Sequence, residues 1–434
     1  MKRTGLKTVQ KLLATGLIVS SLGLLSAATA QEPVTLRFVS LAWQEQAIDS
    51  VKEIVAAWNE ANPDVQVEYQ QVDWGSINDY LTTAFETGSV PDVFHNESTQ
   101  VLDFGRRGYL TDLAPLISDD LRGDIVEGAW ATVDDGDDNI WGVPFLWESR
   151  IVLYNKNLFA EAGIDAPTVE NPWSWNDMRE AAKTLTVDND GDGTPEQWGA
   201  GISLNSPVNF LFNLGVGFGA QYFYQEDGNW TINVGEAEKA LPQLMMDMLY
   251  TDKTASPDGL GLSGPELFPG FFEGKYAMLP GIGVWARQQI VESGPENFNW
   301  GVLPPLVAET QEQGAQSQTL SVPDASPNKE AAVQFIDFFI NTANMAELAQ
   351  GDWFFPTRSS SFERPEFQTP DAGWDVATNS VTHLTLAEWQ KVPNFEEFKS
   401  RVATPVFQEL FANRISVDEA GERLEREGAR VLSR

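Results

Sequence analysis

The order of apolar patterns between residues 34 and 94 constrains the fold more than any other feature of this chain. Some stretches alternate between apolar and polar residues, as half-buried strands do, and others repeat apolar residues at helical spacing. The predicted elements are a strand at Val34–Leu41, a helix at Gln46–Ala61, a strand at Val65–Val72, a helix between Ser76 and Gly88, and a strand at Pro91–Phe94. This β-α-β-α-β order predicts a largely parallel sheet covered by helices.

Residues 1–30 have the pattern of a secretory signal peptide. Four basic residues precede an uncharged run from Leu12 to Ala30, which closes on the cleavage motif Ala28-Thr29-Ala30. An uncleaved membrane anchor is the alternative, because the uncharged run is nearly long enough to span a bilayer. The cleavage motif favours removal, with Gln31 as the first mature residue.

The absence of cysteine bears on where the protein is located. With no cysteine the chain has neither disulfides nor a lipid-bearing cysteine after the signal, so we expect a protein released into the periplasm. Of 28 Lys and Arg residues four lie in residues 1–30, which leaves 24 against 63 Asp and Glu, a formal charge of −39. So acidic a surface repels nucleic acid and anionic membranes, and neither is an expected partner. The mature chain also exceeds what one hydrophobic core usually supports, so two lobes are expected.

Four segments carry a family resemblance. Trp141–Thr186 begins with a VP-x-x-x-E motif that ends at Glu148, and it continues through a short strand, an AGI segment and a Trp-Ser-Trp helix start. A PDV strand lies in Gly88–Pro115, a GK-x-AM segment in Phe271–Gly281, and an S-x-N-K-E-A-A helix start in Ser326–Phe339. In this order and spacing they resemble the family-1 extracellular solute-binding proteins of ABC sugar importers, which include the maltodextrin-binding proteins.

The resemblance implies an α/β, two-lobe periplasmic-binding-protein fold with hinge strands and a ligand cleft between the lobes. The implied crossings between lobes lie near Val143–Trp147, Trp300–Pro305 and Asn341–Ala346. Residues 31–145 and 303–342 are assigned to the N-terminal lobe, and residues 146–302 and 343–434 to the C-terminal lobe.

Ligands of open α/β sheets bind at the carboxyl ends of the strands, so loops that leave the strands supply the candidate contacts. Indole rings stack on the C–H faces of sugars, while carboxylates and amides bond to their hydroxyls. The candidates are Trp43, Gln44, Trp74, Asn96, Glu97, Trp147 and Glu148, with Trp285 and Trp353 on the second lobe. Glu148 matches the sugar-binding glutamate of the family motif; its alternative role is an ion pair with Arg150.

Two arginines and two histidines have competing interpretations. Arg287 and Arg358 could bind a ligand anion, but salt bridges are favoured in so acidic a chain. His95 and His383 are predicted to be structural, since nothing in the sequence gives them catalytic partners.

The segment from Asp188 to Glu196 is a candidate calcium loop. Asp188, Asp190, Asp192 and Glu196 offer alternate oxygen ligands, with glycines at the sharp turn. An EF-hand needs a glutamate twelfth, where Gly199 stands, so the motif is incomplete. The alternative is a solvated turn, and no cofactor is required for function.

Three classes of function fit these features. The leading interpretation is a non-enzymatic, monomeric binding protein that closes over a di- or oligosaccharide and delivers it to ABC permease subunits. A secreted glycoside hydrolase is the second, because paired carboxylates and tryptophans also suit glycan cleavage. A receptor for a phosphorylated molecule, such as glycerol phosphate, is the third; it needs several basic groups, and the cleft loops named above carry none.

Overall fold

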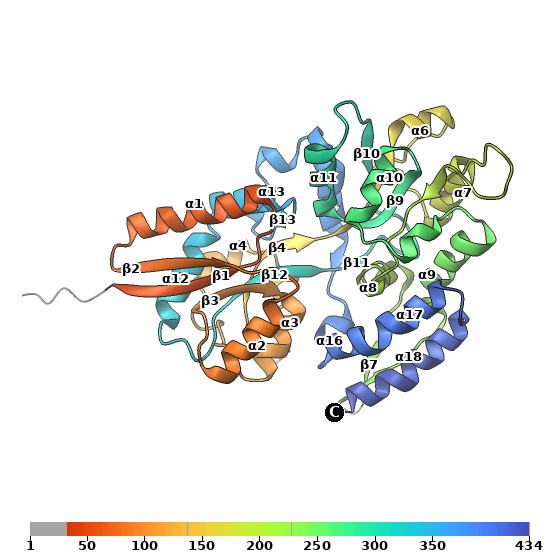
Figure 1. The fold of residues 1–434 in the computed structure, drawn as a ribbon. Coiled ribbons are helices and arrows are strands. Elements are labelled where there is room, and N and C mark those ends of the chain that lie inside the picture. The colour runs from red at the N-terminus through yellow and green to blue at the C-terminus, as the bar shows by residue number, and fades with distance from the viewer. Residues whose placement is uncertain (1–32, 137, 227, 434) are drawn as a thin grey trace, which may run out of the picture.

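The structure, a computed structural model, describes residues 33–136, 138–226 and 228–433. The predicted signal peptide lies outside these residues. None of the described helices combines the length and the apolar character needed to cross a lipid bilayer. Figure 1 shows two α/β lobes side by side, joined near the middle of the molecule.

The first lobe is built on a six-stranded sheet in the order β13-β4-β12-β3-β1-β2. Its strands are β1 (Val34–Ser40), β2 (Val65–Gln71), β3 (Val93–Glu97), β4 (Val143–Glu148), β12 (Gln316–Ser321) and β13 (Phe355–Pro356). Strand β1 pairs in parallel with both β2 and β3, which confirms the predicted parallel arrangement. The other strands join antiparallel, so the complete sheet is mixed.

The helices of the first lobe follow the predicted boundaries where the sequence signals are strong. They are α1 (Glu45–Ala61), α2 (Ile77–Thr87), α3 (Ser98–Arg106), α4 (Asp119–Asp124), α5 (Glu127–Trp130), α12 (Lys329–Phe339), α13 (Thr342–Asp352) and α14 (Ser359–Phe362). Gly88 ends α2 with φ 70°, a left-handed conformation that glycine adopts without strain. Ser76 precedes α2 but does not cap it, because its hydroxyl donates to Asp73 Oδ2 at 2.6 Å.

The second lobe is built on a four-stranded sheet in the order β10-β5-β9-β6. Its strands are β5 (Arg150–Asn155), β6 (Trp198–Ala200), β9 (Tyr276–Gly283) and β10 (Trp300–Leu303). Its helices are α6 (Lys156–Glu161), α7 (Trp175–Leu185), α8 (Val208–Gly215), α9 (Glu236–Met246), α10 (Phe268–Phe272), α11 (Arg287–Ser293), α16 (Phe395–Phe398), α17 (Thr404–Phe411) and α18 (Val417–Leu432). Two small sheets complete the fold, one of β7 (Phe223–Glu226) with β8 (Asn229–Ile232) and one of β11 (Gln313–Gly314) with β14 (Leu384–Thr385).

The first two crossings lie slightly later in the chain than predicted. Strand β4 belongs to the first sheet and β5 to the second, so the chain crosses at Ser149, the residue between them. Ser149 is buried, and its hydroxyl lies 2.6 Å from that of Ser380. The second crossing runs from the end of β10 at Leu303 to the start of β12 at Gln316.

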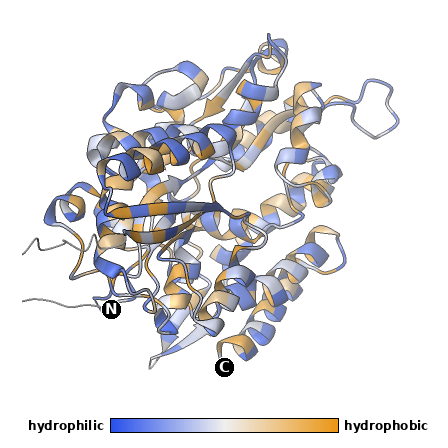
Figure 2. Cartoon of the chain, turned by 60° about the vertical axis from the view of Figure 1, so that its left-hand side comes forward, coloured by the Kyte–Doolittle hydropathy of each residue, from blue (hydrophilic) through white to orange (hydrophobic). Residues whose placement is uncertain are grey.

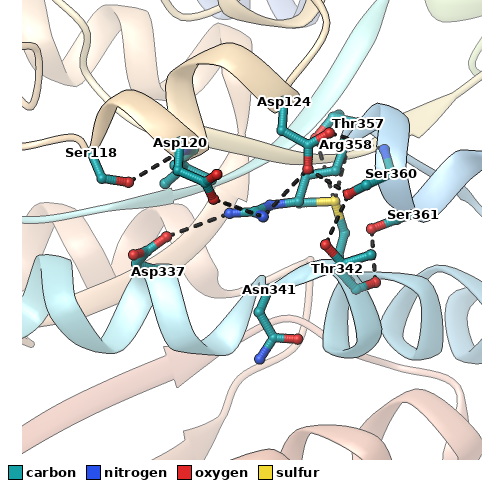
Figure 3. A network of polar contacts seen from close by, with 12 residues as sticks. Ser118, Asp120, Asp124, Asp337, Asn341, Thr342, Thr357, Arg358, Ser360 and Ser361 are labelled. Atoms are coloured by element: carbon teal, nitrogen blue, oxygen red, sulfur yellow. Dashed lines mark hydrogen bonds and ion pairs between the residues drawn. The ribbon is translucent and has the colours of Figure 1, made fainter.

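The third crossing differs from the predicted boundary at residue 343. Helix α13 packs against α1, and β13 pairs with β4, so the chain stays with the first lobe beyond residue 343. Arg358 fixes this segment there: its guanidinium lies 3.4 Å from Asp124 of α4 and 3.4 Å from Asp337 of α12 (Figure 3). The chain then returns to the second lobe through α15 (Trp374–Asn379), which contacts β10.

The hydrophobic core is continuous from one lobe into the other. Leu146 and Trp147 of β4 belong to the same buried cluster as Ile151 and Leu153 of β5. The helices in Figure 2 carry both hydrophobic and hydrophilic residues, and in α1 the buried residues Val51, Ile54, Val55 and Trp58 recur at helical spacing. The two lobes therefore share a packed base at the crossings.

Candidate ligand-binding site

The first crossing places two opposite charges at the base of the space between the lobes. Glu148 ends β4 and Arg150 begins β5. Glu148 Oε1 lies 3.2 Å from Arg150 Nη2, and these side chains are only 16% and 14% exposed. The alternative role considered for Glu148, an ion pair with Arg150, therefore forms, while its Oε2 has no protein partner in the described part of the chain.

A pocket of about 270 Å³ opens beside this pair on the second lobe. It lies where the parallel strands β6 and β9 end, the edge at which α/β sheets bind ligands. Its polar lining consists of Arg150, Ser203, Asn205, Ser206, Asn209 and Ser263, and its aromatic lining of Phe210 and Trp285. Hydroxyls and amides both donate and accept hydrogen bonds, so the pocket suits a neutral, hydroxyl-rich molecule.

An aromatic ring of the first lobe contacts one of the rings that line this pocket. Trp43 leaves β1 of the first lobe and is 41% exposed. Trp285 follows β9 of the second lobe and lines the pocket. The ring centroids lie 5.5 Å apart with an interplanar angle of 82°, an edge-to-face contact across the two lobes.

A hydrogen bond between Gln44 and Asp352 anchors the loop that carries Trp43. Gln44 is 3% exposed, and its Nε2 donates to the Asp352 carbonyl at 2.8 Å. Burial raises the pKa of the Asp352 carboxyl to about 8, although the nearby backbone N–H groups of Gln44 and Trp43 act to lower it. Gln44 therefore supports the loop, and the structure does not bring its side chain to the pocket.

Asn96 and Glu97, the predicted residues at the end of β3, have different surroundings: Asn96 is packed inside the first lobe and Glu97 lies toward the second. Asn96 is 1% exposed, and its Oδ1 accepts from the backbone N–H of Glu97 at 2.8 Å. Burial raises the pKa of Glu97 to about 7, against the lowering effect of Lys399 from the second lobe. Glu97 thus faces the second lobe, whereas Asn96 is held inside the first.

Trp74 and His95 pack against each other, with ring centroids 5.6 Å apart. His95 Nδ1 accepts from the backbone N–H of Leu41 at 3.2 Å. Burial lowers the pKa of His95 to about 3, so the ring is neutral at ordinary pH. This supports the structural role predicted for His95 and places Trp74 at the edge of the first lobe.

Two predicted tryptophans lie away from the pocket. Trp147 is 3% exposed and points into the core, where its ring approaches Gly128. Trp353 stacks on Trp374 with centroids 5.6 Å apart. Trp147 is thus a core residue, whereas the partly exposed Trp353 stays a prediction.

Arg287 and Arg358, the two arginines with competing interpretations, have different partners. Arg358 forms the salt bridges that were favoured, to Asp120, Asp124 and Asp337. Arg287 is fully buried against aromatic rings, and no ion pair to it is found among the described residues. The salt-bridge expectation is therefore right for Arg358 and wrong for Arg287.

The candidate calcium loop brings three of its four predicted ligands together. Carboxylate oxygens of Asp188, Asp190 and Glu196 lie within 4.8 Å of one another, and all three residues are exposed. Asp192 is outside this group, and its Oδ1 accepts from the backbone N–H of Thr194 at 2.7 Å. Calcium takes six to eight oxygens, so three carboxylates would need carbonyl or water oxygens beside them.

Several pocket residues were missed in the sequence. Ser203, Asn205, Ser206 and Asn209 follow β6, a strand of only three residues that leaves little periodic signal. The available signal was composition, because residues 201–209 read GISLNSPVN, a polar stretch of the kind that lines ligand pockets.

Two α/β lobes joined at a packed base, with an aromatic and polar pocket beside the crossing, are the architecture of a solute-binding protein of the two-lobe class. The family model for bacterial extracellular solute-binding proteins matches residues 42–346. The chain belongs to this family, which confirms the resemblance carried by its four sequence segments.

Relatives and solved structures agree with this assignment. The chain is 39% identical over 388 residues to a Streptomyces antibioticus protein named uncharacterized lipoprotein in oleD 5'region, covering 89% of this chain and 84% of that protein. It is 23% identical over 385 residues to the arabinooligosaccharide-binding protein of Halalkalibacterium halodurans, covering 84% and 82%. The fold is similar to that of the sugar-binding protein MalE from Xanthomonas citri, with a TM-score of 0.78 and 20% identity over 92% of this chain and 98% of that one.

The raised pKa of Asp352 predicts a pH-dependent stability. The Asp352 carboxyl has a pKa near 3.8 in the unfolded chain and about 8 in the folded protein, so the folded protein binds the proton more tightly. The free energy of unfolding should therefore fall as the pH rises from 4 to 8. Replacing Asp352 with Asn should reduce that fall by at least about 1 kcal/mol, the equivalent of roughly one pKa unit. Urea unfolding across this pH range measures it. Asp165→Asn, at an exposed site, should keep the wild-type slope, and an unchanged slope in Asp352→Asn would contradict the prediction.

Calcium binding at the Asp188 loop stays a prediction. After treatment with a chelator, added Ca²⁺ should raise the melting temperature by a few degrees, because a ligand that binds only the folded state stabilises it. Differential scanning fluorimetry with Ca²⁺ and Mg²⁺ measures the effect, and Glu196→Gln should remove it. No shift in the wild type would leave the loop a solvated turn.

Proposed function

We propose that this protein binds a di- or oligosaccharide between its lobes and delivers it to the permease of an ABC importer. The observation that carries the proposal is the pair of Trp43 and Trp285, one from each lobe, at a pocket lined by hydroxyl and amide side chains. Indole faces stack on sugar C–H groups, and the polar lining bonds to the hydroxyls. The arabinooligosaccharide specificity in one relative's name supports a carbohydrate.

A neutral sugar fits the charges of the pocket better than a phosphorylated ligand does. Arg150 is the cation of the pocket lining, and it is already paired with Glu148. A phosphate would have to compete with that carboxylate for a single guanidinium, and it would meet the negative field of a very acidic protein. The charges therefore favour hydroxyls as the recognised groups.

Catalysis is not part of the proposed function. Glu97 and Glu148 are the carboxylates that a hydrolase would use, but Glu148 is paired with Arg150. In a retaining glycosidase one carboxylic acid protonates the glycosidic oxygen while the other carboxylate attacks the anomeric carbon, and a carboxylate held by a guanidinium is hindered in either role. We propose that the cleft binds its sugar and releases it unchanged.

Export and release complete the proposal. The basic start, uncharged run and Ala28-Thr29-Ala30 motif support cleavage before Gln31. A relative is named a lipoprotein, but this chain has no cysteine to carry a lipid. We propose a soluble, monomeric periplasmic protein. Expressed with its own leader, it should appear in the osmotic-shock fraction with Gln31 as its first residue by mass spectrometry; recovery in the membrane fraction with residues 1–30 intact would contradict release.

The binding proposal is tested by calorimetry on a panel of mono- and disaccharides, longer glycans, glycerol phosphate and amino acids. We expect at least one di- or oligosaccharide to bind and to be recovered intact by chromatography. Glu148→Gln should weaken that binding by 10- to 100-fold, since a hydrogen bond to a charged group contributes about 1.5–3 kcal/mol. Trp285→Ala should weaken it similarly through lost stacking.

The matched control is Trp230→Ala, which removes an indole from the β7–β8 hairpin outside the pocket. It should retain wild-type affinity. Binding of glycerol phosphate alone would overturn the sugar assignment, and cleavage products would overturn the non-enzymatic one.

A further inference from the structure

Arg287 is a buried cation without a carboxylate partner. It is the first residue of α11, is 0% exposed, and its Nη2 has no hydrogen-bond partner within the described chain. The comparably buried Arg358 pairs with three aspartates in Figure 3. Burial lowers the pKa of Arg287 to about 9, which is still above neutral pH, so its guanidinium remains charged.

Aromatic rings take the place of the missing counterion. The guanidinium carbon lies 3.9 Å from the ring centroid of Trp374, 5.4 Å from that of Trp353 and 5.9 Å from that of Phe355. We call these three rings the aromatic cage. A cation over an aromatic face is attracted by the ring quadrupole, and the attraction grows when water is excluded. The cage is therefore the main electrostatic compensation for this buried charge.

The cage joins chain segments from both lobes. Trp353 and Phe355 follow α13 and belong to the segment attached to the first sheet. Trp374 begins α15, the return segment next to β10, and the carbonyl of Ala372 accepts a long 3.5 Å hydrogen bond from Arg287 Nη1. Arg287 itself belongs to the second lobe.

Arg287 also holds the turn that presents Trp285. Its Nε donates to the carbonyl of Val284 at 3.0 Å, within the short helical turn Val284–Ala286. The pocket tryptophan lies in the middle of this turn. Any shift of the guanidinium relative to the cage would therefore move the turn and its indole ring.

The opposite ring is tied to the same segment. Asp352, directly before Trp353, anchors the Trp43 loop through Gln44. Trp353 has φ 58°, a left-handed conformation that is uncommon for a bulky side chain. This conformation turns the chain so that Asp352 faces the Trp43 loop while the Trp353 ring faces Arg287.

We propose that Arg287 is a positioning residue for ligand binding, whose guanidinium in the aromatic cage fixes the Trp285 turn against the segment that also anchors Trp43. The cage thereby sets the spacing of the two ligand-facing rings and the angle between the lobes. The inference rests on the proposed function for its consequence on affinity, but its geometric part does not depend on any ligand.

The test measures the distance between the lobes directly. Because the chain has no cysteine, spin labels attach only where cysteines are introduced. Ala56→Cys on α1 and Asn176→Cys on α7 are exposed sites on opposite lobes. Double electron–electron resonance on this labelled protein should give a single narrow distance distribution.

Two substitutions at Arg287 separate charge from packing. Arg287→Met keeps most of the side-chain volume without the charge, and we expect a broader distribution with a second, shifted distance. Arg287→Lys keeps a cation in the cage and should restore most of the narrow distribution. Affinity for the sugar found in the panel should fall at least tenfold in Arg287→Met and less in Arg287→Lys.

Arg423→Met is the control, since it removes a largely buried arginine whose partners, Glu409 and Glu427, lie in the same lobe and away from the cage. It should lower the melting temperature while leaving the interlobe distance and the affinity unchanged. If Arg287→Met does not fold, Trp374→Phe weakens the nearest face of the cage, and a smaller broadening in the same direction is expected.

The proposal is overturned if the folded Arg287→Met, or Trp374→Phe in its place, matches Arg423→Met in distance distribution and affinity. It is also overturned if Arg287→Met and Arg287→Lys give the same distance distribution and affinity, because the packing of the side chain would then explain its role without its charge. A failure of every sugar to bind would refute the proposed function and leave the distance measurement as a separate test of Arg287.

Discussion

The direct connection between β4 and β5 is the constraint on which the rest of the molecule depends. Only Ser149 separates two strands that belong to different sheets. Residues on either side of it must lie at the base of the interlobe space, which is why Glu148 and Arg150 meet there. Their pairing keeps an acid and a base in a partly buried place without an uncompensated charge.

The treatment of charge differs sharply between the surface and the interior. The chain carries a large excess of acidic residues, whereas three arginines of low exposure each have their own compensation. Arg358 is surrounded by aspartates, Arg150 has Glu148, and Arg287 has aromatic rings. The pocket itself relies on neutral hydroxyls and amides, so its recognition depends on hydrogen-bond geometry and ring stacking more than on ligand charge.

Periodicity explains which parts of the fold and the site could be predicted. The β-α-β-α-β order was legible because each element is long and regular, and Trp43 follows from its place after β1. Trp147 and Glu148 were both assigned to the cleft, yet adjacent residues of a strand point to opposite faces, so only one of them can reach it. Trp147 is buried in the core, whereas Glu148 is partly exposed in its ion pair with Arg150.

The remaining misses concern short elements and long-range partners. Strand β13 has two residues and β6 has three, which is too few for a periodic signal. Strand β13 decides where the third crossing lies, and β6 decides the position of the polar pocket loop. Gln44 and Asn96 have the right chemistry for a ligand, but each is committed to a protein hydrogen bond that the sequence does not show. The cage around Arg287 likewise joins residues 287, 353, 355 and 374, which are distant in the chain.

The edge-to-face contact of Trp43 with Trp285 limits how strongly the lobes hold each other without help from a ligand. Such a pair contributes about 0.5–1.5 kcal/mol, which alone would favour a closed arrangement by roughly tenfold at most. A sugar that stacks on both rings and bonds to the pocket hydroxyls adds affinity for the closed arrangement only. Because a ligand shifts a conformational equilibrium solely through its differential affinity, the proposed sugar would favour the closed arrangement to the extent that it contacts both rings.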